Sequence, residues 1–60
     1  MFKFQLLQTV KDEVTGFTGV ITARAEYSTD KILYLLEAVD STGRPIEWWF
    51  EEARLRGLYE

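Results

Sequence analysis

FTGVITARAEY, residues 17–27, sets the fold class, because its side chains alternate between apolar and polar over eleven positions. This two-residue period, together with the Val, Ile and Thr content, predicts a long antiparallel strand with one face in the core and the other in water. Gly16 and Gly19 bracket Phe17, and glycines in a strand indicate a bulge or the close approach of another backbone. The expected core face carries Phe17, Gly19, Ile21, Ala23, Ala25 and Tyr27.

Further strand signals lie on both sides of this segment. Residues 2–10 alternate between apolar and polar side chains and predict a first strand. The polar residues Lys11-Asp12-Glu13 follow it as an interruption before the next strand. Residues 32–39 are apolar on both faces and are bounded by turn signals, so they predict a central strand.

The C-terminal part begins with the strongest turn signal, residues 40–45, in which Gly43 can adopt positive φ and Pro45 opens the next strand. Residues 46–51 then alternate as a strand. Residues 51–56 predict a short helical turn that Gly57 stops, and Leu58-Tyr59 predicts a brief closing strand.

These elements predict a single domain over residues 1–60, an SH3-like five-stranded antiparallel barrel with one short helical turn near the C-terminus. A two-layer sandwich would need more residues, whereas a curled sheet removes its own edges. The residues expected to fill the barrel are Phe4, Leu6, Val14, Ile21, Ala23, Leu33, Leu35, Trp48 and Phe50, with Leu55 as a plug.

TGFTGVITARAEY, residues 15–27, resembles the signature of small phage and prophage proteins of unassigned function. In that family an opening like KDEV, residues 11–14, precedes a T-G-F-x-G-x-x-T motif, and a W-F-x-E-x-x-L-like segment follows, here WFEEARL at residues 49–55. The resemblance covers roughly residues 11–56. It implies an SH3-like barrel and a viral or prophage origin, and no activity. ILYLL, residues 32–36, departs from the family because it is more apolar than the usual third strand.

The composition argues against catalysis and against bound metals or cofactors. The chain has no cysteine and no histidine, which removes thiolate metal sites and the commonest general base. Ser28 and Ser41 fall in predicted turns with no histidine to activate them, and the adjacent carboxylates of Asp12-Glu13 point apart in a strand, where solvated side chains are expected. We therefore expect no enzymatic activity, no cofactor and no metal site.

The charge balance bears on partners and location. Seven Lys and Arg against ten Asp and Glu give a net charge of −3, and the basic residues are scattered, so binding to nucleic acid is not expected. No apolar run reaches the roughly 20 residues of a membrane-spanning helix, and the first eight positions do not resemble a signal peptide. We expect a complete, cytoplasmic chain, in a bacterial host cell if the phage resemblance holds.

Trp48-Trp49-Phe50 is the strongest binding signal. In a strand, Trp48 and Phe50 share a face and Trp49 points the other way, and tryptophan and tyrosine are enriched where binding energy concentrates. A protein-docking surface is expected, formed by Tyr34, Leu36, Trp48, Trp49 and Arg54. The structural alternative is that the helical turn or the N-terminal strand covers Trp49 and completes the core.

The expected role is binding and modulation of a bacterial host protein, for example a defence or replication factor. The alternatives are a virion structural or assembly accessory and a KOW-like RNA- or ribosome-associated barrel. For RNA, an aromatic and basic platform would combine Arg24, Arg44, Arg54 and Arg56 with Tyr27 and Tyr34. Homodimerisation through the apolar segment 32–39 is a further possibility, because pairing would bury its excess apolar surface.

Overall fold

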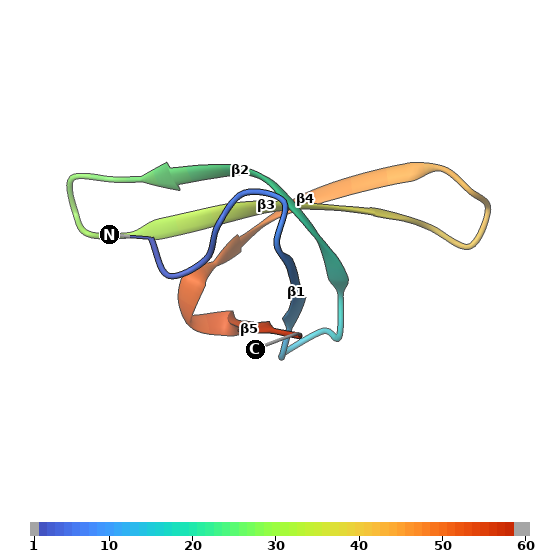
Figure 1. Cartoon of the computed structure of the whole chain (residues 1–60), viewed down its shortest axis with the longest axis horizontal. Helices are drawn as coiled ribbons and strands as arrows, with labels where there is room; N and C mark the ends of the chain where they lie inside the picture. The colour runs from blue at the N-terminus through green and yellow to red at the C-terminus, as the bar shows by residue number, and fades with distance from the viewer. Residues whose placement is uncertain (1, 59–60) are drawn as a thin grey trace.

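The structure is a computed structural model that describes residues 2–58, and among these the chain forms strands and one 3-10 turn. The elements are β1 (Thr9–Asp12), β2 (Thr18–Glu26), β3 (Ile32–Val39), β4 (Pro45–Glu51), η1 (Glu52–Arg54) and β5 (Leu55–Gly57). All five strands join one antiparallel sheet in the order β4-β3-β2-β1-β5 (Figure 1). The predicted all-β class and the short helical turn near the C-terminus are confirmed.

The sheet is curled but not closed. β4 and β5 are its two edges, and no ladder joins them within residues 2–58. Figure 1 shows β2 curving so that β1 and β5 lie below the layer of β2, β3 and β4. The closed SH3-like barrel therefore stays a prediction. Among these same residues, no helix has the length and apolar content to cross a membrane.

A bulge in β2 overturns part of the expected face assignment. Ile21 pairs with Leu36, but the register then shifts, so that Ala23 pairs with Leu35 and Arg24 with Tyr34. Directly opposite residues share a face of the sheet, and the extra residue in a bulge inverts the alternation that follows it. Ala23 and Ala25 therefore lie on the opposite face from Ile21, and the predicted single apolar face from residue 17 to residue 27 is wrong.

The core lies on one face of the curled sheet, called here the inner face. Its members are Phe4, Val10, Ile21, Tyr34, Leu36, Phe50 and Leu55. Of the residues expected in the core, Leu6, Val14 and Trp48 are instead exposed, at 50%, 72% and 70%. Leu33 and Leu35 are only half-buried on the other, outer face, because Tyr34 and Leu36 are the β3 side chains that point inward.

The N-terminal segment is not the strand that its alternation predicted. Residues 2–8 form turns and irregular structure, and Leu7 has φ of 71°, which breaks an extended conformation. The Leu7 amide still donates to the Ile21 carbonyl at 2.7 Å, so the segment lies along β2. β1 begins only at Thr9 and includes Lys11 and Asp12, which the sequence had suggested as a polar interruption.

Two glycine predictions hold. A Cβ on Gly19 would lie 2.8 Å from the carbonyl oxygen of Glu37, so the close approach of β2 and β3 requires a glycine there. Gly43 has φ of 86°, in a turn where the Asp40 carboxylate accepts hydrogen bonds from Thr42 and Arg44.

The last strand of the sheet is Leu55–Gly57. The predicted Leu58-Tyr59 strand is wrong at Leu58, and Tyr59 lies outside the described residues.

Candidate functional site

The β3–β4 hairpin forms an arm that projects from the rest of the sheet. Pairing of β2 with β3 ends at Val20 and Glu37, whereas pairing of β3 with β4 continues to Val39 and Pro45. Residues 38–46 therefore extend beyond β2, toward the right of Figure 1. Near the tip, Val39 is 68% exposed because no third strand lies beside it.

Both tryptophans of β4 lie on this hairpin and both are exposed. Trp48 is opposite Leu36 on the inner face, and Trp49 is opposite Leu35 on the outer face. Their exposed fractions are 70% and 46%. The prediction that the neighbouring indoles point in opposite directions is confirmed, and the alternative in which Trp49 completes the core is wrong.

The inner side of the arm borders an open hollow of about 530 Å³. Its lining is mostly aromatic and aliphatic: Thr15, Phe17, Ile46, Glu47, Trp48, Phe50 and Arg54. The Phe17 and Phe50 rings pack with their centroids 5.3 Å apart. The Arg54 guanidinium lies 5.5 Å from the centre of the Phe50 ring. Apolar surface that stays exposed in so small a protein is a typical feature of a binding site.

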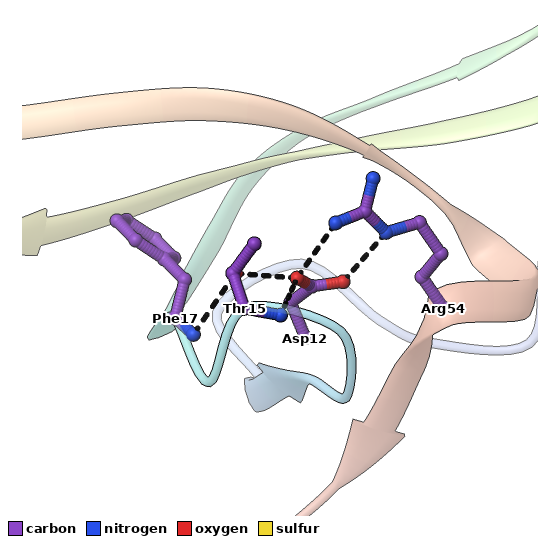
Figure 2. A network of polar contacts seen from close by, with 4 residues as sticks. All are labelled: Asp12, Thr15, Phe17 and Arg54. Carbon is purple, nitrogen blue, oxygen red and sulfur yellow. Dashed lines mark hydrogen bonds and ion pairs between the residues drawn. The ribbon is translucent and has the colours of Figure 1, made fainter.

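A buried carboxylate, that of Asp12, binds two of the residues that line the hollow, Thr15 and Arg54 (Figure 2). Asp12 is fully buried and accepts two hydrogen bonds from Arg54, Nε to Oδ1 and Nη2 to Oδ2, both at 2.8 Å. Its Oδ2 also accepts from the amide and the hydroxyl of Thr15. Thr15 Oγ1 in turn accepts from the Phe17 amide at 3.3 Å. The network thus joins β1, the β1–β2 loop and η1, and it positions Phe17.

The same contacts set the ionisation of this carboxyl group. The hydrogen bond from the Arg54 guanidinium holds the pKa of Asp12 well below its usual range, against the opposing effect of burial, and the hydrogen bonds from Thr15 lower it further. A buried carboxylate is stable only when it is paired in this way. The sequence predicted a solvated Asp12 and a docking role for Arg54. In the structure Asp12 is buried, and Arg54 has a structural role because two of its nitrogens donate to Asp12.

Two other expected docking residues lie inside the molecule. Tyr34 and Leu36 have no exposed surface, so the prediction that their side chains contribute to a docking surface is wrong. The Tyr34 hydroxyl accepts hydrogen bonds from the amides of Lys3 and Phe4, at 3.0 and 3.1 Å, and donates to Glu52. Burial raises the pKa of Tyr34, and the bond to the Glu52 carboxylate raises it further.

The outer face of the arm is acidic around Trp49. Glu47, Trp49 and Glu51 alternate along β4, and Glu37 on β3 lies directly opposite Glu47. Glu51 pairs with Lys31 at 3.4 Å, whereas neither Glu37 nor Glu47 forms an ion pair with a described residue. Like charges placed opposite each other are unfavourable. This face therefore carries negative charge that the described part of the chain leaves uncompensated.

Two residues of the platform suggested for RNA, Tyr34 and Arg24, are engaged within the molecule. Tyr34 is buried, and Arg24 stacks 4.4 Å above the Phe2 ring while donating to the Phe4 carbonyl at 3.1 Å. No group of three acidic side chains that could hold a metal ion occurs within residues 2–58.

The chain matches no protein-family model and no curated protein.

Proposed function

We propose that this chain is a non-enzymatic binding protein that docks a protein partner on β4, with the two tryptophans as the main contacts. The observation that carries the proposal is that two adjacent indoles, on opposite faces of one strand, are 70% and 46% exposed in a protein of 60 residues. Tryptophan is the residue most enriched among those that dominate binding energy. Large apolar side chains exposed next to a hollow are typical of interaction sites.

The proposed site differs from the sequence prediction in its membership. Trp48 and Trp49 remain, and Ile46 and Phe17 join them because they line the hollow or its rim. Tyr34 and Leu36 support the strand from the core, and Arg54 fixes the loop that carries Phe17.

The proposed fold family and partner rest on the resemblance. The strand order, with η1 between β4 and β5, supports an SH3-like arrangement. If the chain is of phage or prophage origin, the partner is a bacterial host protein, and the chain modulates that protein by covering part of its surface. The virion accessory role is the competing proposal, in which the partner is a viral structural protein.

The test begins with capture from a bacterial lysate on the immobilised protein. The captured protein is then identified and purified, and its affinity is measured by calorimetry. We expect Trp49→Ala and Trp48→Ala to weaken binding at least about tenfold each, as for residues at the centre of an interface. Tyr27→Ala is the matched control, because Tyr27 is also exposed, at 51%, but lies in the β2–β3 turn, at the opposite end of β3 from the β3–β4 turn.

Retention of binding in both tryptophan variants would overturn the proposal. So would a lysate in which no protein binds in a tryptophan-dependent way. Because Trp48 is so exposed, Trp48→Ala is expected to fold even if Trp49→Ala does not, and circular dichroism checks this before the binding measurement.

A further inference from the structure

The free edge of β4 has a defined hydrogen-bonding pattern. In an antiparallel ladder, pairs that exchange hydrogen bonds alternate with pairs whose backbone groups point away from each other. The Asp40 amide donates to the Arg44 carbonyl at 2.9 Å, and the register then runs without a break to Leu33 and Glu51. Counting along this ladder, Ile46, Trp48 and Phe50 bond to β3. Glu47 and Trp49 direct both their N–H and their C=O groups outward, and Glu51 directs its N–H outward, since its C=O is the N-cap acceptor of η1.

These outward groups have no partner in the described part of the chain. β4 is an edge of the sheet, and none of the described backbone hydrogen bonds in turns and loops involves Glu47, Trp49 or Glu51. Pro45 fits the same pattern, since its missing N–H falls at an outward position of the edge. An edge of this kind is a template for another strand.

We propose that the partner binds as an added antiparallel β-strand along β4, and that the added segment alternates basic and apolar side chains. This inference rests on the proposed docking function and specifies its mode and partner chemistry. Strand addition is a recurring way to recognise an extended peptide, in which backbone hydrogen bonds supply affinity and alternate side chains supply specificity.

The basic half of the pattern follows from the outer face. In an antiparallel added strand, residues that exchange hydrogen bonds with Glu47, Trp49 and Glu51 lie directly opposite them and place their side chains on the same face. There they meet the carboxylates of Glu47 and Glu51, the carboxylate of Glu37 beyond them, and the face of the Trp49 indole. Lysine or arginine at these positions would neutralise the Glu37–Glu47 pair and contact the indole.

The apolar half follows from the inner face. Intervening side chains of the added strand point to the side of Ile46, Trp48 and Phe50, where the hollow of about 530 Å³ lies. Apolar side chains there would cover the exposed Trp48 ring. A second copy of this chain is a poorer occupant, because its own β4 would bring further glutamates to an already acidic face and the chain carries a net charge of −3.

The probe is the blocked peptide acetyl-Lys-Val-Lys-Val-Lys-Val-Lys-amide, whose seven residues match the length of β4. Amide hydrogen exchange of the full chain is followed by NMR with and without the peptide. With the peptide at about ten times its Kd, we expect exchange at Glu47, Trp49 and Glu51 to slow about tenfold, since the free fraction falls as 1/(1 + [L]/Kd). The amides of Ile46, Trp48 and Phe50 already bond to β3, so they report the local stability of the hairpin.

Two methylated peptides separate strand addition from simple electrostatic attraction. The lysine amides of the bound peptide face β4, so N-methylation of the lysines should abolish protection, whereas N-methylation of the valines should leave it. Glu47→Gln should weaken binding of the parent peptide several-fold. Glu13→Gln removes the same charge from the exposed β1–β2 loop and should change it little.

Each contrary result overturns the inference. The first is equal binding of the two methylated peptides, and the second is binding of a Glu-Val analogue as tightly as the Lys-Val peptide. The third is the absence of amide protection at millimolar peptide. The fourth is protection of the three amides by a rising concentration of the protein alone, which would identify a second copy as the occupant. Tryptophan-dependent capture without amide protection would refute strand addition and leave the docking function standing. Amide protection by the peptide, with no tryptophan-dependent protein partner, would refute the docking function instead.

Discussion

Along the β3–β4 hairpin, inward-facing side chains are buried at one end but are partly exposed closer to the β3–β4 turn. Tyr34 and Phe50, opposite each other at one end, are 0% and 6% exposed, while Leu36 and Trp48, the next inward-facing pair, are 0% and 70% exposed. The first pair lies under the N-terminal segment, whose Phe4 ring packs 5.5 Å from Tyr34. Trp48 has no such cover. Burial along a strand is therefore decided by what packs over it, and the alternation of side chains only decides which face each residue occupies.

The end of the hairpin near Asp12 and Tyr34 is called here the closed end, because the N-terminal segment covers Tyr34. The buried polar groups of the closed end all form hydrogen bonds, whereas some polar groups of the arm do not. Around Asp12 and Tyr34, every buried side-chain oxygen or nitrogen of the described residues has a hydrogen-bond partner. Along the free edge of β4, the outward N–H groups of Glu47, Trp49 and Glu51 and the outward C=O groups of Glu47 and Trp49 have no partner in the described chain. The facing carboxylates of Glu37 and Glu47 also form no ion pair there. We interpret the closed end as the part that stabilises the fold and the arm as the part that we propose binds the partner.

Removing the Asp12 carboxylate should have the largest effect on stability. Asp12→Ala leaves the Arg54 guanidinium and the Thr15 amide without their acceptor, at a site with no exposure for Asp12. A domain of this size has little stability to lose, so we expect the variant to be largely unfolded at 25 °C by circular dichroism. Asp40→Ala is the control, because Asp40 bonds only within its own turn. Equal melting temperatures for the two variants would remove the distinction between the closed end and the arm.

The Tyr34 hydroxyl should be the next most important group. Tyr34→Phe leaves the buried Phe4 amide without an acceptor, which we expect to lower the free energy of unfolding by about 1–3 kcal/mol. Urea denaturation measures the change. Tyr27→Phe removes an exposed hydroxyl and should alter the free energy by less than about 0.5 kcal/mol. If the two substitutions cost the same, the hydroxyl of Tyr34 does not hold the N-terminal segment in place.

Acid should weaken the closed end. The hydrogen bond from Arg54 keeps the pKa of Asp12 below the ordinary carboxyl value of 3.8 in the folded state. In Glu52, burial raises the pKa, but the bonds from Tyr34 and the Lys3 amide outweigh it and lower the pKa overall. The unfolded chain therefore takes up these protons first, so stability is fully present above the ordinary carboxyl pKa and falls as the pH drops below it. The urea midpoint should be level near neutral pH and decline in acid; a midpoint that is constant or rises in acid would contradict this.

Trp48→Ala should have the smallest effect on stability. Its ring is mostly in solvent, so the free energy of unfolding should change by no more than about 0.5 kcal/mol, while binding of the proposed partner should weaken at least about tenfold. Urea denaturation beside the binding measurement gives both values. A loss of stability as large as that of Tyr34→Phe would mean that Trp48 belongs to the core and that the arm is not free.

Several features could be predicted from the sequence because they depend on local chemistry. Two adjacent residues of a strand point apart, which gave the opposite directions of Trp48 and Trp49. Gly43 and Gly19 were predicted from turn chemistry and from the absence of a side chain in an alternating strand. These predictions need only the neighbouring residues in the chain.

The features that could not be predicted depend on distant contacts. The β2 bulge between Ile21 and Ala23 inverts the faces that follow it, and nothing in the alternation marks its position. Asp12 looks solvated among charged neighbours, yet its partner Arg54 lies 42 residues away. Asp12 followed by Thr15 was the one available signal, since aspartate and threonine form side-chain hydrogen bonds in turns.

Amide hydrogen exchange along β4 in the free, dilute protein tests the central claim most directly. We predict an alternating pattern, in which Ile46, Trp48 and Phe50 exchange slowly through their bonds to β3 and Glu47, Trp49 and Glu51 exchange at rates close to those of an unstructured chain. Slow exchange at all six positions, independent of protein concentration, would mean that the edge is already occupied within one molecule, and it would contradict the account.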